Sequence, residues 1–163
     1  AALEGARLIA VLTQAQDPGN AGTIIRAADA AGADAVVLVR GSVDPTAPKV
    51  VRSTAGSLFH LPVVTGVALD DAVTALHNAG LTVLAADGRG DFDLFEAESL
   101  LEAPSAWLLG NEAHGLPSEA LSRADAVVSI PIYGKAESLN VAAAAAVCLY
   151  ASARAQAQNS GRS

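Results

Sequence analysis

The sequence is poor in cysteine, methionine and aromatic residues. Its 163 residues include no methionine, a single cysteine and only 4% aromatic residues. One cysteine, Cys148, cannot form an internal disulfide, which excludes a disulfide-stapled fold. Its place among alanines predicts a small buried side chain rather than a reactive thiol. We therefore expect a protein of a reducing compartment, the cytoplasm.

Long apolar runs and positive charge are also scarce. Glycine, proline or a charged residue interrupts every apolar run before it reaches membrane-spanning length, and no basic segment precedes an apolar one at the start, as a signal peptide requires. Ten Lys and Arg against seventeen Asp and Glu give a net charge of −7, which argues against a chain that holds nucleic acid by bulk electrostatics. A local basic patch remains open, because the first third holds Arg26, Arg40, Lys49 and Arg52.

What the chain does contain is apolar sequence, 52% hydrophobic against 17% charged residues. Continuous apolar runs predict strands at 8–13, 35–39, 62–65, 81–85, 106–109 and 127–130. Helices are predicted between them, at 23–31, 49–53, 69–78 and 118–123, and after the last strand, with Gly32 and Gly80 as stops. This order predicts one α/β domain with a mostly parallel sheet and helices on both faces. We place the domain at 1–157 and a flexible polar tail at 158–163, with fraying expected from Gln156.

The three most polar loops, 14–22, 110–117 and 131–140, each follow a strand. Ligands of parallel sheets collect beyond the carboxyl ends of the strands, so we expect these loops to meet at one edge. In the first loop, Asn20 has a short side chain that can bond the loop or a ligand. The later Arg26 suits a phosphate or ribose clamp, because guanidinium offers forked donors. An Asx-turn with a surface arginine is the alternative. No G-x-G-x-x-G fingerprint follows the first strand.

The second loop places Glu112 between two glycines directly after a buried strand. His114 lies two residues further on, but no second His or Cys is spaced as a metal ligand, so no metal is expected. His60 and His77 are predicted to be structural or surface residues. No serine occupies a nucleophile elbow, which disfavours a hydrolase.

The third loop runs from Ile130 to Asn140 into an alanine-rich helix. Ser138 is the predicted N-cap, and such a helix start suits an anion or an electron-rich ligand edge. The helix has almost no polar face over three turns, so burial on most sides is expected. An ordinary capped helix without a ligand is the alternative.

In this order and spacing, the three loops closely resemble the signature motifs of the SpoU (TrmH-type) family of RNA ribose 2′-O-methyltransferases, in the SPOUT superfamily. The first motif is similar to Asn20–Gly22 through Arg26, and the second to Leu109–Glu112 with Gly115 and Leu116. The third is similar to Ile130–Ile132 continuing to Ser138–Asn140. The resemblance spans nearly the whole chain.

The resemblance implies S-adenosylmethionine as methyl donor, an RNA ribose 2′-hydroxyl as acceptor, a deep C-terminal trefoil knot, and a homodimer joined by the Arg26 helix and the last helix. Carried over by motif, the catalytic residues are Arg26, Asn20, Glu112, Ser138 and Asn140. The cofactor-binding residues are Leu84, Ala85, Ala86, Gly110, Asn111, Glu112, Gly115, Ile130, Ile132, Ser138, Leu139 and Asn140. RNA contacts are expected from Arg26, Arg40, Lys49 and Arg52.

An arginine rarely gives up its proton, so Arg26 is expected to stabilise the developing alkoxide and the adjacent phosphate. Little sequence precedes the first strand, so we expect an upstream RNA-binding segment to be absent from this chain, and ribosomal RNA is favoured over transfer RNA. The alternative function is a non-catalytic knotted domain that binds RNA or nucleotide. The presence of the whole catalytic set disfavours it. A Rossmann-type nucleotide-binding enzyme is disfavoured by the missing glycine fingerprint.

Overall fold

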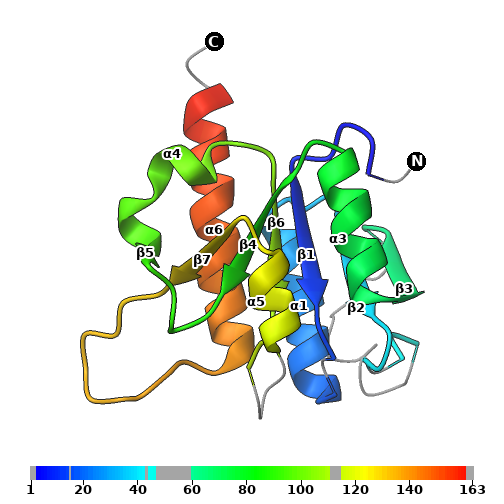
Figure 1. Ribbon diagram of the computed structural model, residues 1–163, viewed down its shortest axis with the longest axis horizontal. Coiled ribbons are helices and arrows are strands. Elements are labelled where there is room, and N and C mark those ends of the chain that lie inside the picture. The colour runs from blue at the N-terminus through cyan, green and yellow to red at the C-terminus, as the bar shows by residue number, and fades with distance from the viewer. Residues whose placement is uncertain (1–2, 15, 43, 47–59, 111–114, 161–163) are drawn as a thin grey trace.

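The computed structural model describes residues 3–14, 16–42, 44–46, 60–110 and 115–160. They form one sheet with the strand order β3-β2-β1-β6-β4-β7-β5, and every pairing is parallel (Figure 1). The strands are β1 (Leu8–Leu12), β2 (Ala35–Val39), β3 (Val63–Val67), β4 (Thr82–Ala86), β5 (Phe92–Asp93), β6 (Ser105–Leu109) and β7 (Ala126–Ser129). The predicted parallel α/β sheet is confirmed.

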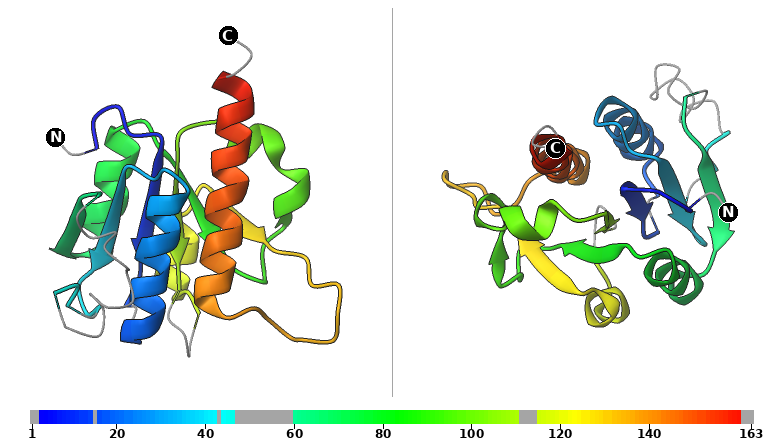
Figure 2. Two further views of the ribbon diagram at one scale, coloured as in Figure 1. Left: turned by 180° about the vertical axis from the view of Figure 1, so that it is seen from behind. Right: turned by 90° about the horizontal axis from the view of Figure 1, so that it is seen from above.

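Helices cover both faces of this sheet, as the view along the strands makes plain (Figure 2). One face carries α1 (Pro18–Ala30) and α6 (Val141–Ser160), which pack side by side, with η2 (Leu94–Glu96) and α4 (Glu98–Leu101). The other carries α3 (Leu69–Asn78) and α5 (Ser118–Arg123). In β1, Leu8, Ala10 and Leu12 enter the first core and Ile9 and Val11 the second, the alternation that a strand imposes.

Two buried polar side chains, Ser152 and Gln156, hold α6 against the rest of the domain. The indole Nε1 of Trp107 donates a hydrogen bond to Ser152 Oγ at 2.8 Å, and both residues are fully buried. Gln156 Nε2 donates to the backbone oxygens of Arg7 at 2.9 Å and Ala103 at 3.2 Å. Cys148 is fully buried, as predicted, and burial raises the pKa of its thiol to about 12. The helix is thus held along its second half.

Two predicted helix starts are wrong, for the same reason. Helix α1 begins at Pro18 rather than at Thr23, because Asp17 Oδ1 accepts the amides of Gly19 at 2.8 Å and Asn20 at 3.1 Å and proline suits the first helical position. Much of the predicted first loop is therefore helix.

Helix α6 begins at Val141, and its cap is Asn140 instead of Ser138. Asn140 Oδ1 accepts the amides of Ala142 at 2.8 Å and Ala143 at 3.3 Å. In both helices a side-chain oxygen of the residue just before the first turn, Asp17 or Asn140, satisfies the otherwise unpaired amides and sets the helix start.

Other boundaries differ in detail. The helix at 69–78 and the one at 118–123 form as predicted, and Gly32 and Gly80 follow their helices with φ of +81° and +84°. The polar segment from Gln156, expected to fray, stays helical to Ser160. Over its first three turns α6 is buried or half-buried except at Ala143 and at Tyr150, which is 51% exposed. The predicted burial on most sides is confirmed, and one side of the helix stays uncovered in this chain. The helix predicted at 49–53 lies outside the described residues.

Candidate functional site

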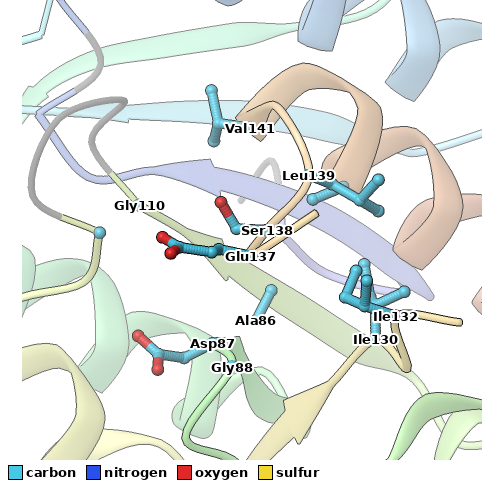
Figure 3. A pocket seen from close by; sticks show the side chains of 12 residues that line it. Ala86, Asp87, Gly88, Gly110, Ile130, Ile132, Glu137, Ser138, Leu139 and Val141 are labelled. Atoms are coloured by element: carbon cyan, nitrogen blue, oxygen red, sulfur yellow. The ribbon is translucent and has the colours of Figure 1, made fainter. Parts of the chain in front are cut away.

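A cavity of about 330 Å³ opens beyond the carboxyl ends of β4, β6 and β7 (Figure 3). This volume lies in the range of small-molecule sites. Three loops and the start of α6 supply its lining. The lining residues are Ala86 at the end of β4 with Asp87 and Gly88 after it, Gly110 and Gly115 after β6, Ile130, Ile132, Glu137, Ser138 and Leu139 after β7, and Val141 and Ala144 in α6.

One part of the cavity wall is apolar and another is polar. Ile130 and Ile132 lie next to each other on one side, while Glu137 and Ser138 lie nearer to Gly110 (Figure 3). Ile132 and Leu139 are 38% and 41% exposed, so both present apolar surface at the cavity. An apolar wall facing a few polar groups suits a flat heterocycle that carries a polar chain.

Gly110 and Gly115 approach each other closely at the cavity. A Cβ on Gly110 would meet the carbonyl carbon of Gly115 at 2.6 Å, closer than any real contact. Gly115 has a φ of +67°, which side chains with a Cβ adopt only under strain. The second motif therefore requires both glycines for its shape.

Asp87 forms the most constrained polar contact of the cavity. Its Oδ1 accepts Arg89 Nε at 2.8 Å and its Oδ2 accepts a terminal guanidinium nitrogen at 2.8 Å, and the carboxylate side chain is 9% exposed. These bonds from Arg89 hold the pKa of the Asp87 carboxyl below its ordinary value. Arg89 also donates to the backbone oxygen of Leu116 at 3.4 Å, so it joins the loops after β4 and β6.

The first and third motifs meet at a direct contact. Asn140 Nδ2 donates to Asn20 Oδ1 at 3.3 Å, across 120 positions of sequence, while Asn140 Oδ1 caps α6. The expectation that the three polar loops converge at one edge of the sheet is confirmed for their described residues.

The predicted site residues divide into those in the cavity and those apart from it. Ser138 lines the cavity, together with the predicted Ala86, Gly110, Gly115, Ile130, Ile132 and Leu139. Leu84 and Ala85 do not, because they are fully buried inside β4 and pair with β6 and β7. Asn140 does not belong to the lining, and its side chain caps α6 and contacts Asn20. Asp87, Gly88, Glu137, Val141 and Ala144 were missed, although their places directly after a strand or beside Ser138 gave a signal.

Of the four predicted RNA contacts, the structure describes Arg26 and Arg40, and both are exposed. Arg26 is exposed on α1 and makes no hydrogen bond or ion pair within the described part of the chain. Arg40 is exposed, donates to Gly66 O at 3.3 Å and lines a separate hollow beyond β1 and β2. Asn111, Glu112, Lys49 and Arg52 lie outside the described residues.

His60 and His77 are structural, as predicted. His60 Nδ1 lies 2.7 Å from Asp29 Oδ2, and His77 Nε2 lies 3.0 Å from Asp125 Oδ2. Across the residues that the structure describes, no three His, Cys, Asp or Glu side chains gather as metal ligands do. Within the same residues, no helix combines the length and the apolarity needed to cross a bilayer.

Comparison with known proteins agrees with this geometry. The sequence model of the SpoU rRNA Methylase family matches residues 7–150. The chain is 42% identical over 151 residues to the 23S rRNA (guanosine(2553)-2′-O)-methyltransferase RlmP of Bacillus subtilis, covering 91% of this chain and 58% of that one. It is 41% identical over 142 residues to the 23S rRNA (uridine(2479)-2′-O)-methyltransferase of Streptomyces viridochromogenes, covering 84% and 49%.

Solved structures give the same picture. The SpoU methyltransferase AviRb of Streptomyces viridochromogenes, in complex with the cofactor AdoMet, superposes with a TM-score of 0.84 at 37% identity, covering 92% of this chain and 60% of that one. A protein described for 2-OH methylation of C/U34 on tRNA superposes with a TM-score of 0.82 at 32% identity, covering 93% of this chain and 97% of that one.

The chain spans only about half the length of the curated relatives that it matches. The share of the relative that is covered is 58%, 54% and 49% for three of them.

Proposed function

Because this chain belongs to the SpoU rRNA Methylase family, we propose that it transfers a methyl group from S-adenosylmethionine to a ribose 2′-hydroxyl of RNA. The observation that carries this proposal is the cavity beyond β4, β6 and β7, built from the second and third motifs and joined to the first by the contact between Asn140 and Asn20.

The cavity fits S-adenosylmethionine by size and by chemistry. Ile130, Ile132 and Leu139 offer an apolar wall for the adenine, and Ser138 and the backbone around Gly110 and Gly115 offer polar groups for the rest. The donor supplies an electrophilic methyl group on a sulfonium; on transfer, the S–C bond breaks with its electron pair returning to sulfur and a C–O bond forms. The protein has to position the 2′-hydroxyl in line and assist loss of its proton.

The remaining motif residues orient the acceptor. Guanidinium groups keep their protons in neutral solution, so Arg26 stabilises the developing alkoxide and the neighbouring phosphate, and the proton leaves to solvent or to another acceptor. Asn20 and Asn140 hold the helix starts of motifs one and three against each other. Ser138 and Glu112 complete the set that we assign to ribose and loop positioning.

Arg26 belongs on this account to a site shared between two subunits. Its exposed position, without a partner among the described residues, supports a homodimer in which the uncovered sides of α1 and α6 meet a second copy. The same proposal includes a trefoil knot in the C-terminal part. Support comes from the strand order, in which β4 lies between β6 and β7, although both follow it in the chain.

Ribosomal RNA is the favoured target, since the relatives named above act on 23S rRNA. Transfer RNA is the second candidate, supported by the tRNA-modifying protein that this chain matches over 97% of that protein's length. The proposed RNA contacts are Arg40, Lys49 and Arg52. We assign residues 1–157 to the catalytic domain. Because the relatives are longer than this chain, we also propose that the whole protein has an additional RNA-binding segment outside that domain. A cytoplasmic location goes with either target.

Incubation with S-adenosylmethionine carrying a labelled methyl group tests the activity. The whole protein is expected to label ribosomal RNA at a position that resists alkaline hydrolysis, because 2′-O-methylation removes the attacking hydroxyl. Labelling of transfer RNA alone moves the target to the second candidate. Cofactor binding without labelling of either RNA favours the non-catalytic RNA-binding domain instead.

A further inference from the structure

Two carboxylates line the cavity, and they differ in their surroundings. Asp87 is paired with the Arg89 guanidinium through bonds of 2.8 Å, so this pair carries no net charge. Glu137 is exposed and makes no hydrogen bond or ion pair with the residues that the structure describes. Figure 3 shows its carboxylate beside Ser138, in the space of the cavity.

No described cation of the cavity wall balances Glu137. Lys135 lies two residues earlier in the same loop, but it does not belong to the lining, and Arg89 is already bound to Asp87. The remaining described lining residues are uncharged side chains and glycines. The described lining therefore carries one uncompensated negative charge.

We propose that Glu137 is a specificity-determining residue that makes the cavity prefer the charged methyl donor over the spent product. The inference rests on the proposed function. In both S-adenosylmethionine and S-adenosylhomocysteine the ammonium and carboxylate of the amino acid part cancel. The donor has a sulfonium in addition and is a cation, whereas the product has a neutral thioether.

A carboxylate at the cavity lowers the free energy of the cation and leaves that of the neutral product nearly unchanged. Because Glu137 is solvated, its effect is that of an exposed ion pair, about two- to fivefold in affinity. Each transfer removes the positive charge from the ligand, so the attraction ends when the product forms. Glu137 thereby favours release of product in exchange for fresh donor.

Calorimetric titration of both ligands into the wild-type protein and into Glu137→Gln tests this. The substitution keeps the side chain's size and removes its charge. The dissociation constant of S-adenosylmethionine is expected to rise about two- to fivefold, while that of S-adenosylhomocysteine stays the same. Added salt is expected to weaken donor binding in the wild type more than in the variant.

Glu96→Gln is the matched control. Glu96 is exposed on η2 and lies outside the cavity lining, so its loss changes the net charge equally without changing the local field. If Glu137→Gln weakens the binding of both ligands equally, the proposal is contradicted, because Glu137 then contacts the part that the two ligands share. An unchanged affinity for S-adenosylmethionine in Glu137→Gln contradicts it as well. If the wild type binds neither ligand, the proposed function itself fails.

Discussion

The two ends of α6 use polar side chains in opposite ways. At the end near the amino ends of the strands, Ser152 and Gln156 are buried, and their hydrogen bonds go to Trp107 and to backbone oxygens. At the cavity end, Asn140, Ser138 and Glu137 are exposed, and the bond from Asn140 to Asn20 is long at 3.3 Å. At the buried end, the polar side chains form their hydrogen bonds within the protein and stabilise the fold. At the cavity end, the polar side chains are exposed and available to a ligand. Substitutions at the two ends should therefore separate stability from activity.

The largest effect is expected at the exposed end, on catalysis. Arg26→Ala should lower the rate of methyl transfer by about 10²–10³-fold, the usual cost of removing one group that stabilises a developing oxyanion. Affinity for S-adenosylhomocysteine should remain, because Arg26 does not line the cavity. Single-turnover transfer and calorimetry measure the two quantities. Arg123→Ala, which removes an arginine paired with Asp70 on the surface, is the control; normal turnover in Arg26→Ala would remove Arg26 from the mechanism.

At the buried end, Ser152→Ala should act on stability. It leaves the indole N–H of Trp107 buried without an acceptor, which costs about 1–3 kcal/mol of unfolding free energy. Urea unfolding measures the loss, and the rate of methyl transfer by the folded protein should not change. Ser122→Ala, at an exposed serine that bonds within its own helix, should cost less than about 0.5 kcal/mol. A loss of activity without a loss of stability in Ser152→Ala would contradict the division between the two ends.

Asn140 serves both purposes, so two substitutions are needed there. Asn140→Ala removes the cap and should cost about 1 kcal/mol of stability as well as activity. Asn140→Asp keeps an oxygen that can cap α6 but removes the Nδ2 donor to Asn20. We expect near wild-type unfolding in Asn140→Asp with reduced transfer. Full activity in this variant would show that the contact with Asn20 has no part in the reaction.

The smallest effect concerns Arg89 and the pH dependence of stability. The Asp87 pKa is lowered in the folded protein, so its contribution to stability is present above its unfolded pKa and is lost as the pH falls through the lower folded value. Arg89→Gln should reduce that contribution by less than about 1 kcal/mol, because Arg89 is largely solvated. The difference in unfolding free energy between wild type and variant should be largest near neutral pH. It should shrink toward zero as the pH falls below ~4 and the Asp87 carboxylate is protonated. A constant difference across this range would mean that Asp87 is not the group involved.

Much of this arrangement was predictable from the sequence. All six predicted strands formed within two residues of their apolar runs, because strands covered on both faces of a parallel sheet are continuously hydrophobic. The convergence of the loops followed from strand direction alone. The predicted starts of α1 and α6 were wrong, because Asp17, Ser138 and Asn140 are all suitable N-caps. Which one caps a helix depends on which side-chain oxygen reaches the unpaired amides of the first turn. The short elements after β4, within an acidic segment, had no periodic signal, and the Asp87–Arg89 pair depends on a turn that composition does not specify.

The central claim is that the cavity beyond β4, β6 and β7 holds the methyl donor. Calorimetric titration of S-adenosylhomocysteine into the wild-type protein and into Ala144→Phe tests it most directly, because Ala144 lines the cavity from α6 and a phenylalanine there fills the space. We predict saturable binding with one ligand per chain in the wild type, lost in the variant while its far-ultraviolet circular dichroism is unchanged. No binding by the folded wild type, or equal binding by both proteins, would contradict the account.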